Sequence, residues 1–346
     1  VISGQAITTA GIGQNIALAS ISMTAARALT VSGDMRATGG LTLRATTGDI
    51  TVGGNLVGHD VSATATAGNV NVDTPQNNTS GSTTLRAGTV IDIDNSVQAL
   101  NNLTLETVSD VGGNLTAGDN LTINAAATLS GGDRTFISTN GDIDLNAAVN
   151  STTGEGLILS AGNGTVYAQA IGTGVGGRVG ALSITADAAQ LDGNIVAASV
   201  DTHLVGLTTL TAGTVNIDTV GGTTIDLGAL AGANNLTISA GTTVDLANAD
   251  IASLVVSAAS DVTFNGNFVT SGQVRVDTGI TGNITVANPT GSIQAGGNII
   301  LDNTGVGDVV INGNVSTTGS STIDIDSGHD VNIAQLATAS VGAVDG

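Results

Sequence analysis

The sequence predicts an all-β fold, a parallel β-solenoid with turns of about 20 residues. Three observations predict it: apolar–polar–apolar triplets recur along the chain, Gly, Asn and Asp separate them, and they return at a nearly constant interval. Alternation with a period of two is typical of a strand with one buried and one solvated face. A repeat of about 20 residues is typical of solenoids.

The triplets predict the strands. Their outer positions are Val, Ile or Leu, which favour strands, and turn-forming residues bound each one. No stretch shows the three-and-four spacing of an amphipathic helix. The triplets are 41–43, 50–52, 70–72, 91–93, 103–105, 121–123 and 143–145 in the first half, and 215–217, 244–246, 274–276, 284–286, 323–325 and 331–333 in the second.

The interval predicts which strands are neighbours. Leu41 precedes Val61, Ile50 precedes Val70, and Thr83 precedes Leu103 by the same distance of 20 residues. We therefore expect each of these pairs to lie side by side in successive turns, with two or three strands in a turn and about 17 turns in all. One turn buries too few side chains to offset its backbone entropy, so the repeat is needed for stability.

The corners between strands are rich in Gly, Asn and Asp. We expect the left-handed conformation there, which Gly adopts freely, and Asn side chains that hydrogen-bond along the solenoid axis. Longer loops are expected at Pro75–Ser82, Thr128–Asn140 and Gly172–Gly180, and Pro289 is expected at a corner. No stretch reads as a linker, so residues 1–346 are predicted to form one continuous solenoid domain.

Composition argues against several classes of partner and cofactor. The net charge is −21, Lys and Cys are absent, and the hydrophobic fraction is 41% with only 1% aromatic residues. Such a charge argues against nucleic acid and anionic membrane surfaces as partners. Without Cys there are no disulfides or thiol ligands, no apolar run is long enough for a membrane-spanning helix, and no cofactor is expected.

The corner-and-strand pattern of Gly118-Asp119-Asn120-Leu121-Thr122-Ile123 and Gly141-Asp142-Ile143-Asp144-Leu145 resembles the filamentous-haemagglutinin-like large exoproteins of bacteria. The resemblance implies a right-handed parallel β-helix, secretion through a partner outer-membrane pore, and a role in adhesion, biofilm scaffolds or toxin-delivery stalks. That family carries an Asn-Pro-Asn-Gly-like motif near the start of its secretion domain. The nearest match here is Asn288-Pro289-Thr290-Gly291, which we interpret as a corner.

Pairs of Asp are candidate calcium ligands, because Ca²⁺ prefers carboxylate oxygen. The densest group is Asp324, Asp326 and Asp330; the other pairs are Asp92 with Asp94 and Asp142 with Asp144. We interpret them instead as solvated strand positions, since the intervening Ile residues must point inward. Carboxylates on neighbouring turns also reach glycosidase spacing by repetition alone, so an enzyme is not expected and no catalytic residue is assigned.

Other polar residues have plainer interpretations. His59, His203 and His329 share no spacing and are expected at the surface. The Asn-x-Thr sites are glycan acceptors in principle, but they lie where corners need Asn: Asn102, Asn114, Asn120, Asn235 and Asn283. Thr64 and Thr66 fit an ice-binding row once, without continuing it.

We therefore expect a structural component of a secreted bacterial fibre or adhesin stalk at the cell surface. The chain opens at Val1 without a leader and shows no end caps, so it is expected to be a segment of a longer rod or a subunit that stacks head-to-tail. Its partners would be itself, by head-to-tail or lateral association, and cell-surface glycans or proteins. The alternative is a carbohydrate-binding or carbohydrate-cleaving β-helix.

Overall fold

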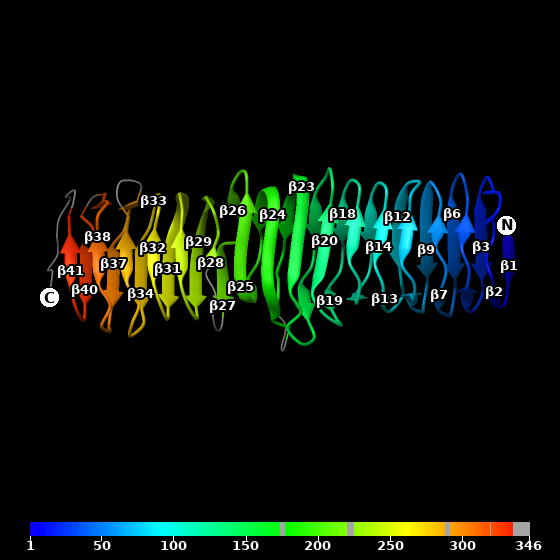
Figure 1. Cartoon of the computed structure of the whole chain (residues 1–346), viewed down its shortest axis with the longest axis horizontal. Helices are drawn as coiled ribbons and strands as arrows, with labels where there is room; N and C mark the ends of the chain where they lie inside the picture. The colour runs from blue at the N-terminus through cyan, green and yellow to red at the C-terminus, as the bar shows by residue number, and fades with distance from the viewer. Residues whose placement is uncertain (174–176, 220–224, 288–290, 319, 335–346) are drawn as a thin grey trace. The chain divides into compact units, whose positions relative to one another are not determined.

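The computed structural model describes residues 1–173, 177–219, 225–287, 291–318 and 320–334 (Figure 1). All regular secondary structure in these residues is β-strand, as predicted. No helix in the part of the chain described is long and apolar enough to cross a membrane. Asn288–Thr290, with the expected corner at Pro289, lie outside the described residues.

The chain forms two compact units, which are described separately. Unit 1 comprises Val1–Val179 with Thr185–Asp187, and unit 2 comprises Gly180–Ile184 with Ala188–Gly346. Both are parallel β-solenoids in which each strand pairs with its counterpart one turn later. That the two make one continuous domain stays a prediction.

Unit 1 has three sides, here named A, B and C. Side A begins with β1 and carries the longer strands, and the second half of β23 (Leu157–Ala168) continues it. Its strands are β1 (Ile2–Gly4), β3 (Ile21–Ala25), β6 (Leu41–Ala45), β9 (Asp60–Ala65), β12 (Ser82–Arg86), β15 (Leu103–Leu105), β18 (Leu121–Ile123) and β21 (Ile143–Leu145).

Side B is an unbroken eight-stranded parallel sheet of three-residue strands. Its strands are β2 (Ile7–Thr9), β4 (Leu29–Val31), β7 (Ile50–Val52), β10 (Val70–Val72), β13 (Ile91–Ile93), β16 (Ser109–Val111), β19 (Ala127–Leu129) and β22 (Val149–Ser151).

Side C is interrupted. Its first two strands, β5 (Met35–Arg36) and β8 (Leu56–Val57), form a separate two-stranded sheet. The ladder resumes one turn later and ends in the first half of β23. The resumed strands are β11 (Gln76–Asn78), β14 (Val97–Ala99), β17 (Leu115–Ala117) and β20 (Arg134–Ser138).

Unit 2 repeats the three-sided plan, with longer strands that turn corners. The first side pairs parts of β25 (Ile195–Leu204), β27 (Thr214–Thr219), β29 (Leu230–Ala240), β31 (Ala249–Ala258), β34 (Val274–Thr278), β37 (Ile299–Asn303) and β40 (Ile323–Ser327). The second pairs β28 (Ile225–Asp226), β30 (Val244–Leu246), β32 (Val262–Phe264), β35 (Ile284–Val286), β38 (Val309–Ile311) and β41 (Val331–Ile333). The third pairs β24 (Val179–Leu191), β26 (Thr208–Leu210), the first halves of β29 and β31, β33 (Asn267–Thr270), β36 (Ser292–Ala295) and β39 (Asn314–Thr317).

The predicted register is confirmed. Leu41 pairs with Val61, Ile50 with Val70, and Thr83 with Leu103. The intervals run from the 18 residues between Ile91 and Ser109 to the 25 between Val274 and Ile299. Turns lie about 21 residues apart, and the described residues form about 15 turns rather than the expected 17.

Two of the expected loops were wrong in part. Pro75–Ser82 contains strand β11, and Thr128–Asn140 contains strand β20. In β11 the inward-pointing residues are Gln76 and Asn78 instead of apolar ones, so the alternation that marks a strand is missing. The third expected loop, Gly172–Gly180, includes residues 174–176, which lie outside the described part of the chain.

The reason given for the corner glycines also needs correction. Positive φ occurs in irregular loops, as at Gly13 and Gly154, and at a few corners such as Gly162, but not at the corner glycine Gly118. A Cβ on Gly118 would lie 1.6 Å from the carbonyl oxygen of Leu100 in the preceding turn. Glycine is needed there because two turns approach closely, rather than for its conformational freedom.

Candidate functional site

Side C of unit 1 is hollowed on the outside, next to its interruption. Two open hollows, each of about 200 Å³, share Arg36 and Val57 in their walls. Asp34, Asn55, Asn77 and Thr79 complete the first, and Gln14, Asn15, Thr38 and Ser80 are among the residues that complete the second. We refer to the pair as the Arg36 hollow. Its lining is mostly polar, and it contains one cation.

The loop before β3 forms one wall of the Arg36 hollow. Ile12 and Leu18 bridge to Met35 and Ala37, and between them the Arg36 backbone N–H donates to Ile12 O at 2.9 Å. Residues 13–17 therefore bulge outward beside the Arg36 side chain. Gly13 has a φ of 74°, and a Cβ there would lie 2.3 Å from Arg36 O, so only glycine fits the start of the bulge.

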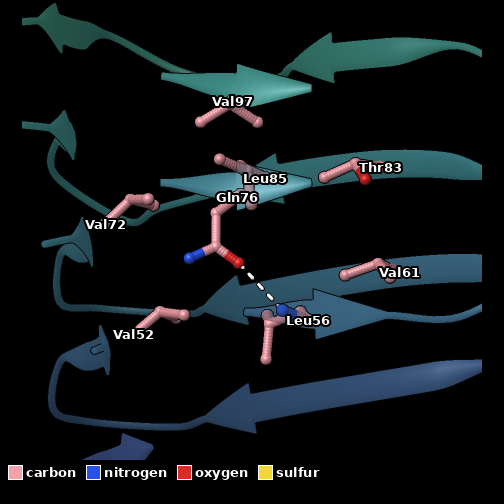
Figure 2. Close-up of a pocket in the computed structure, with 8 residues that line it drawn as sticks. All are labelled: Val52, Leu56, Val61, Val72, Gln76, Thr83, Leu85 and Val97. Carbon is pink, nitrogen blue, oxygen red and sulfur yellow. Dashed lines mark hydrogen bonds between the residues drawn. The ribbon is translucent and has the colours of Figure 1, made fainter. Parts of the chain in front are cut away.

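The interruption itself is bridged by side chains. Figure 2 shows Gln76 pointing into the core, where its Oε1 accepts the Leu56 N–H at 3.0 Å. Its Nε2 donates to Gly54 O at 3.0 Å. Asn78 likewise accepts the Gly58 N–H at 3.1 Å and donates to Thr83 Oγ1. Two carboxamides thus satisfy backbone groups that a regular strand pair would satisfy.

The space beside Gln76 is too small for a ligand. The cavity between Leu56, Gln76 and Val97 measures about 10 Å³, which is room for one water at most. This cavity belongs to the core, whereas the polar side chains that a ligand can reach lie outside it, in the Arg36 hollow.

Arg36 belongs to a group of arginines without partners. Arg27, Arg36, Arg44 and Arg86 are all exposed, and among the described residues no side-chain hydrogen bond or ion pair engages them. By contrast, Arg134 donates to Val111 O and Asp133 O, and Arg275 forms a bidentate pair with Asp277 at 2.8 Å. The unpaired arginines all lie in the first 86 residues.

The corner asparagines do form the predicted ladders. Asn120 Oδ1 accepts the N–H of Asp142, and Asn120 itself donates its N–H to Asn102 Oδ1. Asn114 and Asn283 accept from the following turn in the same way, and Asn235 Oδ1 accepts from Ser253 Oγ. Every Asn-x-Thr site named above therefore has its side-chain oxygen in a bond between turns.

Acidic side chains line up in rows where register places them together. Asp92 faces Asp110 in unit 1; in unit 2 Asp201, Asp226 and Asp245 form one row, and Asp277, Asp302 and Asp326 another. Burial, followed by the neighbouring charges of Asp94 and Asp110, raises the pKa of Asp92. Burial and the charges of Asp277 and Asp326 raise the pKa of Asp302 in the same way.

The three candidate calcium ligands are placed in two environments. Asp324 and Asp326 point outward from β40, while Ile323 and Ile325, which alternate with them, are buried, as the solvated-strand interpretation expects. Asp330 lies at the next corner, where its carboxylate is within 4.8 Å of side-chain atoms of Asp308 and His329. The structure thus gathers Asp330 with a residue pair that the sequence did not suggest.

His329 is held in an ion pair at that corner. Its Nδ1 lies 2.6 Å from Asp308 Oδ1 and 3.6 Å from Asp330 Oδ2. The hydrogen bond to Asp308, then the charges of Asp330 and Asp308, raise the pKa of His329 above its usual 6.5. His59 and His203 are also exposed, each near one Asp, as expected of surface histidines.

A buried glutamate was missed in the sequence. Glu155 is 4% exposed and closes the loop after β22. Its carboxylate accepts the N–H groups of Thr152 and Thr153, each at 2.9 Å, and hydroxyl hydrogen bonds from Ser151 and both threonines. Burial raises the pKa of Glu155, but the bonds from Ser151 and Thr153 outweigh it and lower the pKa well below the ordinary 4.5.

Side A carries a row of hydroxyls that Thr-x-Thr spacing along the sequence does not reveal. The row runs in register through six turns, because these residues alternate with buried ones and point outward: Ser22, Thr42, Ser62, Thr84, Thr104 and Thr122. Thr64 lies in the neighbouring row, which alternates with Arg44 and Arg86.

Comparisons with protein-family models, with curated proteins and with solved structures found no match. The parallel β-solenoid is therefore supported by the sequence repeat and the structure, and a functional assignment has to start from the side chains.

Proposed function

We propose that the chain is a structural segment of a secreted bacterial fibre or adhesin stalk at the cell surface. The observation that carries this proposal is cohesion between turns. In both units every turn is bonded to the next by parallel ladders and by corner side chains such as Asn120 and Asn283. Such stacking favours a mechanical role, because load along the axis is shared among many hydrogen bonds.

The resemblance of the repeats to filamentous-haemagglutinin-like exoproteins supports the same proposal. Association with further copies, head-to-tail or lateral, is a second form of the proposal.

Immunogold labelling of the producing bacterium tests the location. Label on surface filaments or in the medium is the expected result, and label confined to the cytoplasm would overturn the proposal. The signal from a strain that lacks the gene sets the background.

Electron microscopy of the purified chain at rising concentration tests self-association. Uniform filaments one solenoid wide are the expected result if copies stack end to end. Single particles of unchanged length at every concentration would reject self-association and leave the stalk proposal to the labelling experiment.

A further inference from the structure

The distribution of charge separates the first turns of unit 1 from the rest of the chain. Up to residue 86, four arginines are balanced by four aspartates, Asp34, Asp49, Asp60 and Asp73. The other 24 of the 28 acidic residues follow, with three arginines. An anionic ligand is therefore repelled along most of the sequence and least repelled here.

The Arg36 hollow offers this region a concave surface. Its two parts together are comparable to the lower end of small-molecule sites, which measure roughly 300–1,000 Å³. Arg36 lines both parts, so its guanidinium is within reach of a ligand that occupies either one.

The two parts differ in charge. The part beside the bulge of residues 13–17 contains Gln14, Asn15, Thr38 and Ser80, and Arg36 is its one charged residue. The other part adds Asp34, with Asn77 and Thr79. A carboxylate is therefore favoured in the part that contains Gln14 and Asn15, beside Arg36, and hydroxyl groups that donate to Asp34 are favoured in the part that contains Asn77 and Thr79.

The hydrogen-bonding groups needed for such a ligand are available. No hydrogen bond within the described residues uses the side chains of Gln14, Asn15, Asn77 or Thr79. One carboxylate oxygen of Asp34 accepts the Asn55 N–H at 2.9 Å, and the other oxygen is available to a ligand. Asn55 is committed to the ladder, since its Oδ1 accepts the Asn77 N–H at 2.7 Å.

We propose that the Arg36 hollow binds an acidic sugar, a hexuronate joined to a second hydroxylated sugar ring. The carboxylate pairs with the Arg36 guanidinium beside Gln14 and Asn15, and hydroxyls of the second ring bond to Asp34, Asn77 and Thr79. A charge-assisted bond to arginine supplies the main attraction. Since no aromatic ring lines the site, the affinity is low, with a Kd on the order of 1 mM. This site does not depend on the fibre role.

Titration with digalacturonic acid, followed by the side-chain amide and arginine signals in NMR spectra, tests the proposal. The expected result is a saturable shift of the Gln14, Asn15, Asn77 and Arg36 signals. The fully methyl-esterified disaccharide is the matched ligand without charge, and it should bind about tenfold more weakly or not at all.

Two substitutions locate the site. Arg36→Gln should weaken binding at least about tenfold, whereas Arg44→Gln, which removes an equally exposed and unpaired arginine from side A, should leave it unchanged. Asn77→Ala should weaken binding by a smaller factor, about threefold. Circular dichroism confirms that each variant is folded.

Three outcomes would overturn the proposal. They are no saturable shift at millimolar disaccharide, equal binding of the acid and its ester, and equal loss of binding in the Arg36 and Arg44 variants. The last outcome would indicate general attraction to the arginines of the first turns instead of a site.

Discussion

Sides B and C of unit 1 are hydrogen-bonded from turn to turn in different ways. Side B is one sheet of eight strands, in which the backbone alone carries the ladder from β2 to β22. Side C breaks between β8 and β11, and there Gln76 and Asn78 replace the ladder with carboxamides. The regular side has an unbroken backbone ladder, whereas the interrupted side lies beside the Arg36 hollow. A solenoid therefore gains a concave feature where side chains take over backbone bonds.

The largest expected effect is at the end of side B, where a side chain supplements the backbone ladder. At its last strand, Glu155 binds the loop that follows, so we expect Glu155→Ala to lower the free energy of unfolding by about 3 kcal/mol. The loss follows from the buried Ser151 hydroxyl and the part-buried N–H groups of Thr152 and Thr153, all of which would lose the carboxylate as their acceptor. Urea denaturation with local readout by hydrogen exchange measures it.

The pH dependence of this loop has a defined sign. Because the folded-state pKa of Glu155 is lowered, its stabilisation is complete above the unfolded value of about 4.5 and is lost as pH falls below it. Glu155→Gln should cost less than the alanine variant and remove this pH dependence. An unchanged acid profile in the glutamine variant would contradict the assignment.

The next effect tests side C directly. Gln76→Leu makes the inward row more apolar, yet we expect it to lower the free energy of unfolding by about 2 kcal/mol. Leucine fills the space but leaves the Leu56 N–H and Gly54 O without partners. Chemical denaturation is the measurement, and a more stable variant would show that the carboxamide is dispensable.

A corner between two sides should be less sensitive than either of these. Asn120→Ala removes the acceptor of the Asp142 N–H, which is exposed enough to turn to water, so we expect a loss of about 1 kcal/mol. Asp119→Ala is the matched control, since Asp119 is equally exposed and its side chain makes no bond between turns. Equal losses of stability in the two variants, measured by thermal unfolding, would show that the asparagine ladder does not stabilise the fold.

Side B contains a polar residue whose replacement by an apolar one should stabilise the fold. Ser109 is buried, and its hydroxyl has no hydrogen-bond partner among the residues that the structure describes. Ser109→Ala should therefore raise the free energy of unfolding by up to about 1 kcal/mol. Gln76→Leu and Ser109→Ala both replace a buried polar side chain by an apolar one. Chemical denaturation of the two variants should show stability changes of opposite sign. A loss of stability would show that Ser109 has a partner.

The smallest effect is a local titration in unit 2. The raised pKa of His329 means that its pairing with Asp308 stabilises the fold below pH 6.5 and is lost as pH rises through the folded-state value. NMR titration should give a midpoint above 6.5, and Asp308→Asn should bring it back toward that value. A midpoint at or below 6.5 in the unaltered chain would contradict the ion pair.

The strands were predictable because apolar alternation and spacing are local signals. Triplets such as Leu121–Ile123 are strands, and the interval paired Leu41 with Val61 correctly. Strand β11 was missed because Gln76 and Asn78 occupy inward positions, so its pattern reads as a loop. Nothing in the sequence marks Glu155 as buried or brings Arg36 beside Gln14, since both depend on how a loop folds back on another turn.

The direction of the side-chain bonds carries a consequence for how the solenoid assembles over time. At corners the acceptor precedes the donor by one turn, as from Asn102 to Asn120 and from Asn283 to Asp308, so each finished turn is a template for the chain that follows. Gln76 and Asn78 reverse this order, because they satisfy Leu56 and Gly58 of the turn before. If the chain folds from its N-terminus, we expect turns to be added on this template, with the turn containing β8 incomplete until β11 arrives.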